Sequence, residues 1–162
     1  MVDIDEFLSP DRMILGLRSA SKRQLFQELA GVAAADTGLD QAAILAALTQ
    51  REKLGTTGIG EGIAIPHARV KNLKSLVGFF ARMAAPVEYD ALDDAPVDLV
   101  FLLLAPDDAG TVQLKALARI ARLLRDPEIC ARLRTEQEAG SVHQLLAGRA
   151  PGTPADPTSE RP

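Results

Sequence analysis

The run VDLVFLLLAP at 97–106 is the sequence feature that most constrains the fold. Apolar side chains occupy nearly every position of this run, whereas a strand with one face in water alternates apolar and polar residues. The run therefore predicts a strand that is buried on both faces, inside a sheet that other elements cover on both sides. The run SLVGFFARM at 75–83 has a similar pattern and predicts a second inner strand.

Helical spacing and capping residues predict the elements that cover the sheet. Ser21 can cap a helix that ends at Gly38, and Asp40 can cap a second helix that stops at Gly55. Their expected core-facing side chains are Leu25, Phe26, Leu29, Val32, Ile44, Leu45 and Leu48. A long helix is expected over 111–125, and its expected inward side chains are Leu114, Leu117, Ile120, Ala121 and Leu124. Two shorter helices follow, over 127–137 and 141–148.

The remaining segments complete a pattern in which strands and helices alternate. We expect a helical turn before Pro10, strands at 11–18 and 62–66, and a turn region at 84–95. This pattern predicts an α/β fold: a single domain with a mixed β-sheet flanked by helices on both faces. The domain is expected to cover residues 1–148, and the polar, Pro-rich segment 149–162 is expected to be a disordered tail.

Charge and composition exclude several classes of protein. The net charge of -4 leaves no basic footprint, so we expect no nucleic-acid partner. No apolar run approaches the ~20 residues of a membrane span, and the N-terminus lacks a signal-peptide pattern, so we expect no membrane insertion. A single cysteine cannot form an internal disulfide, and together these features predict a cytoplasmic protein.

The run GTTGIGEGIAIPHAR at 55–69 carries the most informative candidate for chemistry, His67. The chain has only two histidines, and a neutral imidazole is a nucleophile near neutral pH. Pro66 lacks an N–H and pushes Ile65 toward extended backbone, so His67 is expected to emerge at a strand end.

A histidine that accepts a phosphoryl group needs hydrogen-bond donors around it. Backbone N–H groups at Gly58 and Gly60, the hydroxyls of Thr56 and Thr57, and the planar guanidinium of Arg51 are candidate donors. Each of these residues can also have a purely structural role, because Gly-rich loops are often turns and cations favour helix C-termini. On the residues alone, an anion or phosphoryl site and a structural role both remain open.

Other catalytic motifs are absent from the sequence. The loop lacks the Gly-Lys-Ser/Thr of a phosphate loop and the G-x-G-x-x-G order, and no G-x-S-x-G elbow occurs. Two isolated histidines and one cysteine form no zinc set, so we expect no metal and no cofactor. Cys130 is predicted to be an inert core thiol, and His143 is predicted to face solvent.

Three runs, REKLGTTGIGEGIAIPHAR, PVDLVFLLLAP and LKALARIARLLRD, give the chain a family resemblance. It resembles the mannitol/fructose-type EIIA domains of the bacterial phosphoenolpyruvate phosphotransferase system, from about residue 2 to residue 148. Within that family it is most similar to the stand-alone nitrogen-related EIIA proteins. The resemblance implies a mannitol-type EIIA fold and a phosphotransferase component with a phosphohistidine intermediate.

The resemblance also implies roles for individual residues. His67 takes the place of the phosphoryl acceptor, which an HPr-like phosphocarrier phosphorylates after enzyme I has charged the carrier from phosphoenolpyruvate. Arg51 takes the place of the site arginine, and the loop beside the histidine matches at Thr56, Thr57, Gly58 and Gly60.

Two positions depart from the family pattern. Ala68 stands where the family usually has glycine, and a positive φ would be costly there. Gln113 replaces a second site histidine; it can donate a hydrogen bond but cannot carry a proton. Lys115 is a candidate substitute for the lost charge, although a solvated helix lysine is the simpler reading.

Three functions follow from this reading. The first is a phosphoryl-accepting regulator that binds target proteins, such as a potassium transporter or a sensor kinase, according to its phosphorylation state. The second is a sugar-transport EIIA that passes the phosphoryl group to an EIIB. The third is a binding-only module whose phosphotransfer is impaired at Gln113.

Overall fold

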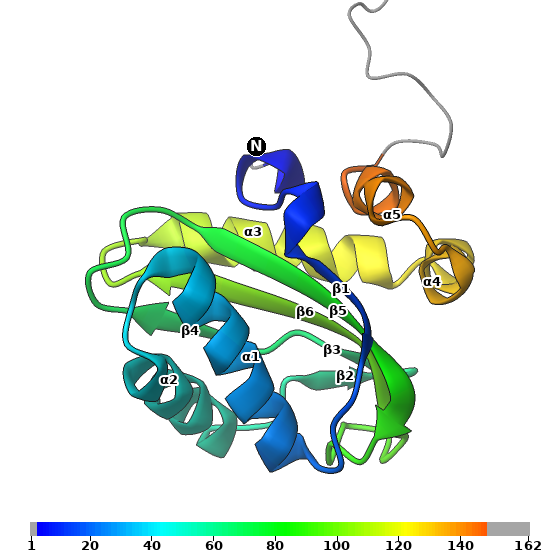
Figure 1. The fold of residues 1–162 in the computed structure, drawn as a ribbon, viewed down its shortest axis with the longest axis horizontal. Coiled ribbons are helices and arrows are strands. Elements are labelled where there is room, and N and C mark those ends of the chain that lie inside the picture. The colour runs from blue at the N-terminus through cyan, green and yellow to red at the C-terminus, as the bar shows by residue number, and fades with distance from the viewer. Residues whose placement is uncertain (1–2, 149–162) are drawn as a thin grey trace, which may run out of the picture.

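The apolar run at 97–106 forms β6 (Val97–Pro106), in which every residue except Asp98 is buried. This computed structural model describes residues 3–148, and Figure 1 shows β6 inside the sheet. β5 (Val77–Val87) pairs antiparallel with one edge of β6 and parallel with β1 (Met13–Leu17) on its other side. Three short strands lie beyond β6: β2 (Gly58–Gly60), β3 (Ile63–Ala64) and β4 (His67–Val70). β3 and β4 run parallel to β6, so the predicted mixed sheet is confirmed.

Helices cover both faces of this sheet (Figure 1). α1 (Lys22–Thr37) and α2 (Gln41–Lys53) lie on one face, and α3 (Thr111–Leu124), α4 (Pro127–Thr135) and α5 (Ala139–Leu146) lie on the other. Alternate side chains of β6 serve the two faces. Val100, Leu102 and Leu104 pack in the core under α1 and α2, and Leu99, Phe101 and Leu103 pack in the core under α3 to α5. The two-sided burial predicted from the continuous apolar run is therefore confirmed.

The predicted helix caps are confirmed. The Ser21 hydroxyl accepts a hydrogen bond from the Gln24 N–H at 3.1 Å, and the Asp40 carboxylate accepts one from the Ala43 N–H at 3.2 Å. Gly38 ends α1 with a φ of 76°, a left-handed conformation that costs glycine little. These caps fix where α2 begins, and α2 ends in the turn that carries Arg51.

Two strand predictions were wrong at the edges of the sheet. β5 continues to Val87 and so includes the first part of the predicted turn region 84–95. Pro86 is tolerated in this part of the strand, because β1 pairs only with Phe80 to Met83 and no strand partner requires the missing N–H. The glycine-rich segment was expected to be a loop, but Gly58–Gly60 forms β2 and pairs antiparallel with β3. A short 3₁₀ turn at Ile4–Glu6 agrees with the helical turn expected before Pro10, and a second follows at Pro10–Arg12.

The predicted inward stripe of α3 is confirmed except at its first position: Ile120 and Leu124 are buried, and Leu117 and Ala121 are partly buried against the same core. Leu114 is 65% exposed, whereas Gln113 is buried together with Ala116, Ile120 and Leu124. A polar side chain therefore occupies the first buried position of this helix. Lys115 is exposed, as its simpler reading predicted.

His143 does not face solvent, so that prediction was wrong. Its side chain is 12% exposed, and Nε2 lies 3.0 Å from the Leu8 carbonyl oxygen and 3.2 Å from Oδ1 of Asp5. The histidine joins α5 to the N-terminal 3₁₀ turns, a tertiary contact that the local sequence could not show. Cys130 is buried, as predicted, and burial raises the pKa of its thiol.

The described part of the chain, residues 3–148, contains no helix that is long and apolar enough to cross a membrane. The tail predicted at 149–162 lies outside the described residues.

Candidate phosphoryl-acceptor site

His67 is the first residue of β4, as expected for a residue that follows Pro66. β3 ends at Ala64, and the chain resumes its pairing with β6 only at His67, which lies opposite Leu103. This interruption places the imidazole at the end of a short strand, where it is half-buried.

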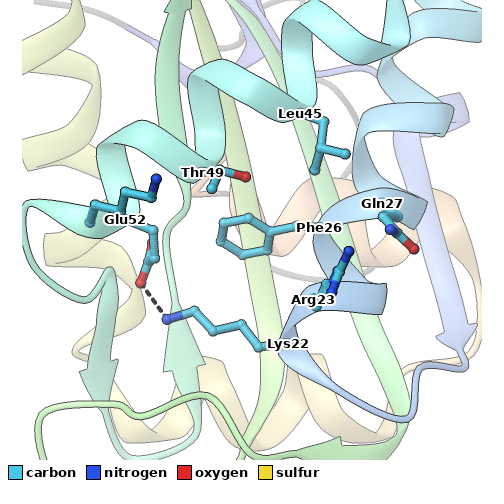
Figure 2. Close-up of a pocket in the computed structure, with 8 residues that line it drawn as sticks. Lys22, Arg23, Phe26, Gln27, Leu45, Thr49 and Glu52 are labelled. Atoms are coloured by element: carbon cyan, nitrogen blue, oxygen red, sulfur yellow. Dashed lines mark hydrogen bonds and ion pairs between the residues drawn. The ribbon is translucent and has the colours of Figure 1, made fainter.

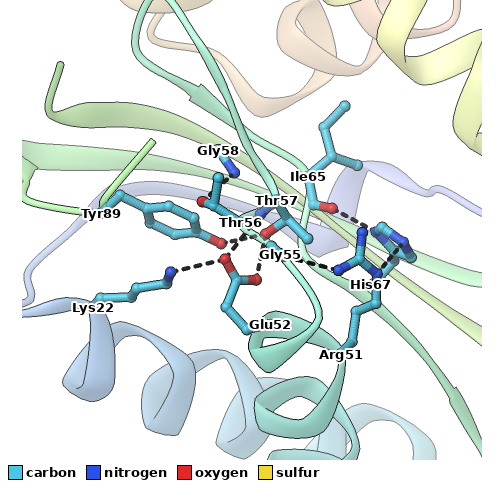
Figure 3. A network of polar contacts seen from close by, with 10 residues as sticks. All are labelled: Lys22, Arg51, Glu52, Gly55, Thr56, Thr57, Gly58, Ile65, His67 and Tyr89. Carbon is cyan, nitrogen blue, oxygen red and sulfur yellow. Dashed lines mark hydrogen bonds and ion pairs between the residues drawn. The ribbon is translucent and has the colours of Figure 1, made fainter. Parts of the chain in front are cut away.

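Two hydrogen bonds define the tautomer of His67. Nδ1 lies 2.8 Å from the Ile65 carbonyl oxygen, which can only accept, and Nε2 lies 3.2 Å from Nε of Arg51, which can only donate (Figure 3). The ring proton is therefore on Nδ1, and Nε2 carries an unprotonated lone pair. The arrangement presents Nε2 as the nucleophilic atom.

The surroundings keep the imidazole neutral. Burial lowers the pKa of His67 below its ordinary value of 6.5; the Ile65 carbonyl opposes this shift, and the charge of Arg51 adds to it. Because protonation would remove the Nε2 lone pair, a lowered pKa preserves the nucleophile at neutral pH.

We expect the His67 imidazole to titrate below pH 6.5, with its proton on Nδ1 above that point. Nitrogen NMR of labelled protein measures both properties, and His143, the other histidine, can be assigned with the His143→Gln variant. Titration of His67 at or above its ordinary pKa, or a proton on Nε2, would contradict this geometry.

Arg51 is held in place by the last turn of α2. Its Nη1 donates to the Gly55 carbonyl at 2.9 Å, while its Nε points to His67. The guanidinium is therefore held beside Nε2 of His67. A phosphoryl group on Nε2 would lie next to a fixed positive charge.

A polar network behind Arg51 fixes the loop between α2 and β2 (Figure 3). Glu52 accepts hydrogen bonds from Lys22 Nζ at 2.8 Å, from the Thr57 N–H at 2.8 Å and from the Thr57 hydroxyl at 2.7 Å. The Thr57 oxygen also lies 2.7 Å from the Tyr89 hydroxyl, which must be the donor because the Thr57 proton points to the carboxylate. Burial raises the pKa of Glu52, but the bonds from Lys22 and Thr57 outweigh it and hold the pKa below its ordinary value. Sequence reasoning did not anticipate this network.

The network changes the interpretation of the threonine and glycine candidates. Thr57 is buried and its hydroxyl proton is committed to Glu52, so it does not point to the phosphoryl position. The Thr56 hydroxyl accepts a hydrogen bond from the Gly58 N–H, so this backbone N–H, one of the predicted loop donors, is already used. A Cβ on Gly58 would lie 2.7 Å from Cβ of Ala91, so close packing explains this glycine. Gly60, with a φ of 105°, belongs to β2.

Gln113, by contrast, comes from α3 to the same pocket as His67 and Arg51. Its Oε1 accepts a 2.7 Å hydrogen bond from Nε of Arg69, whose Nη groups contact the carbonyl oxygens of Asp107 and Gly110. Because Arg69 only donates, the bond fixes the orientation of the amide and leaves its NH₂ group as the part that can donate to another acceptor. Arg69 was missed from sequence; a glutamine on the buried stripe of α3 was the available signal.

These residues surround a pocket of about 400 Å³ between α2, β4 and α3. Leu54 and Leu114 lie at this pocket and are 84% and 65% exposed, which gives it an apolar rim. Ala68 also lines the pocket. It is a strand residue paired with Leu104 and its φ is not positive, so alanine in place of glycine causes no backbone strain here.

Comparison with known proteins agrees with this fold. The family described as "Phosphoenolpyruvate-dependent sugar phosphotransferase system, EIIA 2" matches residues 6–148. The chain therefore belongs to this family of phosphotransfer components.

The similar relatives include proteins named "Nitrogen regulatory protein". One, from Bradyrhizobium diazoefficiens, is 48% identical over 89% of this chain and 94% of its own length. Another, from Pseudomonas aeruginosa, is 37% identical over 90% of this chain and 96% of its own length. The crystal structure of the nitrogen regulatory protein IIA-Ntr from Neisseria meningitidis superposes with a TM-score of 0.84 at 36% identity, covering 88% of this chain and 98% of that one. The chain is thus an EIIA of the nitrogen regulatory kind.

Proposed function

We propose that Nε2 of His67 accepts a phosphoryl group from an HPr-like phosphocarrier in the cytoplasm, and that the phosphorylated and free proteins bind different targets. The observation that carries this proposal is the pair of hydrogen bonds at His67. The Ile65 carbonyl holds the proton on Nδ1, and Arg51 stands at the lone pair of Nε2.

The transfer needs one bond to form and one to break. The Arg51 Nε–H first leaves the Nε2 lone pair, to which it donates in the free protein. The freed lone pair attacks phosphorus, the P–N bond of the carrier's phosphohistidine breaks, and its electron pair returns to the carrier imidazole. The Nδ1–H bond to the Ile65 carbonyl stabilises the positive charge that develops on the His67 ring. Arg51 and Gln113 line the same pocket as His67, and in this proposal the guanidinium and the amide NH₂ group donate to the phosphoryl oxygens.

The apolar rim of the pocket gives the carrier and the targets a surface to contact. Leu54 and Leu114 are exposed on opposite sides of the pocket that holds His67. A phosphoryl group adds about -1.5 to -2 charges between them. A partner that packs against the leucines in the free protein would then meet a charge, so the two states favour different partners.

Target binding is tested by capture from a cell extract. The free wild-type protein, the carrier-phosphorylated protein and His67→Ala are used as bait under the same conditions. We expect at least one partner, such as a potassium transporter or a sensor kinase, to bind one state only, and His67→Ala to keep the unphosphorylated set after incubation with the carrier. Identical partners in all three captures, or rapid transfer of the phosphoryl group to an EIIB, would contradict the regulatory function.

We expect Gln113→Ala to slow phosphorylation of His67 by about tenfold or more, the effect of one hydrogen bond of about 1.5 kcal/mol to a charged phosphoryl oxygen. The phosphorylation rate with a fixed concentration of carrier measures this effect. Lys115→Ala is the matched control, because Lys115 is exposed two residues further along α3 and should leave the rate unchanged. An equal effect of both substitutions would remove Gln113 from the site.

A further inference from the structure

A second hollow lies between α1 and α2, and its volume of about 620 Å³ exceeds that of the pocket at His67 (Figure 2). Phe26 of α1 and Leu45 of α2 give it an apolar floor, and the Phe26 side chain is 5% exposed there. Figure 2 shows the Phe26 ring between the two helices, with Thr49 above it and Lys22 below. Volumes of about 300–1,000 Å³ with an apolar lining and a few polar groups are typical of small-molecule sites.

The charges around this floor have one predominant sign. Lys22, Arg23 and Lys53 are cationic, and Glu52 is the single carboxylate, already paired with Lys22 at 2.8 Å. Arg23 and Lys53 make no hydrogen bond or ion pair with any residue in the range 3–148. A chain with a net charge of -4 thus presents two unpaired cations at the edge of an apolar hollow.

We propose that this hollow binds a small organic anion. The apolar body of the anion, an aromatic or branched group, packs against Phe26 and Leu45. Its single negative group is held by Arg23 and Lys53, and it can also reach Lys22. A neutral ligand of the same shape would pack against the apolar floor but would not be attracted by the cations.

The hollow is joined to the phosphoryl-acceptor site through Lys22. Lys22 donates to Glu52, Glu52 holds Thr57, and the residue before Glu52 is Arg51, which contacts His67. Lys22 has three N–H donors and gives one of them to Glu52, so an anion bound at Lys22 shares its positive charge and weakens the pair with Glu52. The bound anion is therefore a regulator of the position of Arg51, and its effect extends to His67.

The charge requirement is tested with two fluorescent probes, 8-anilinonaphthalene-1-sulfonate and its neutral analogue N-phenyl-1-naphthylamine. We expect Arg23→Gln/Lys53→Gln to weaken binding of the sulfonate by about tenfold and to leave the neutral probe unchanged, since each exposed charge contributes up to about 1 kcal/mol. Equal affinity of wild type and the double variant for the sulfonate would overturn the proposal.

The location is tested by filling the hollow. Thr49→Phe should abolish binding of the sulfonate, whereas Ala46→Phe, an exposed position of α2 outside the lining, should not. In wild type the His67 imidazole resonance should move as the sulfonate saturates, and in Thr49→Phe it should stay. Unchanged binding in Thr49→Phe, or saturation without any response at His67, would contradict the proposal. No carrier or phosphate is present, so these outcomes are independent of whether His67 is phosphorylated.

Discussion

Arg51→Gln is expected to slow phosphorylation of His67 by about 100-fold or more, the usual effect of removing one oriented donor from a developing anion. Gln keeps a donor of similar length but loses the charge and the fixed fork that contacts both Gly55 and Nε2 of His67. The measurement is the rate of phosphoryl transfer from the carrier, with the folded state checked by thermal unfolding.

Lys53→Gln is the matched control for this substitution. Lys53 is another cation in the last turn of α2, but it is exposed and does not line the pocket at His67. We expect its rate to stay within about twofold of wild type, because a single surface charge contributes little at that distance. If Lys53→Gln slowed transfer as much as Arg51→Gln, the effect would reflect net charge and not the geometry of the site.

Glu52→Ala is expected to lower the free energy of unfolding by about 2–3 kcal/mol, since it leaves the partly buried Lys22 ammonium and the hydroxyl and backbone N–H of Thr57 without their acceptor. The side chains of Lys22 and Glu52 are 25% and 11% exposed, so solvent weakens this pair only in part. Denaturant unfolding measures the change. Glu28→Ala, at an exposed position of α1, should alter the free energy by less than about 0.5 kcal/mol.

The contribution of Glu52 also has a defined pH dependence. Because the folded protein holds the pKa of Glu52 below 4.5, the folded state favours the carboxylate. Its contribution is complete above the unfolded pKa and is lost as the pH falls through the lower folded pKa. The stability difference between wild type and Glu52→Ala should therefore be constant near neutral pH and shrink below pH 4.5. A difference that grew toward acid pH would contradict this assignment.

The sequence predicted those parts of the fold that local patterns control. A continuous apolar run defined β6, and Ser21 and Asp40 defined the starts of two helices because each cap acts within one turn. His67 and Arg51 could be paired because a glycine-rich connection and a proline separate them by a short span. These features depend on neighbours in the chain, so a single sequence carries them.

The parts that could not be predicted depend on contacts between distant segments. Two of the three residues of β2 are glycines, which have little strand propensity; the strand pairs with β3, and Gly58 packs closely against the distant Ala91. His143 is covered by the N-terminal turns, about 135 residues away in the chain. Thr57 looked like a phosphate donor, but Lys22 and Tyr89 from other elements complete a network that uses its hydroxyl.

Gln113 misled the prediction of which face of α3 is buried, and it also marks a contact between distant elements. Its position on α3 made Leu114 look like the inward residue, because a buried glutamine breaks an apolar stripe. The structure explains the glutamine through Arg69, which reaches it from β4. A polar residue at a buried helical position is therefore a signal for a site when its partner lies on another element.

The central claim, that His67 is the phosphoryl acceptor, is tested most directly by the intact mass of the protein. Wild type, His67→Gln and His143→Gln are each incubated with phosphoenolpyruvate, enzyme I and an HPr-like carrier, and then weighed by mass spectrometry at alkaline pH. We predict one added phosphoryl group on wild type and on His143→Gln, and none on His67→Gln. An unmodified wild-type protein, or a phosphoryl group that persists in His67→Gln, would contradict the account.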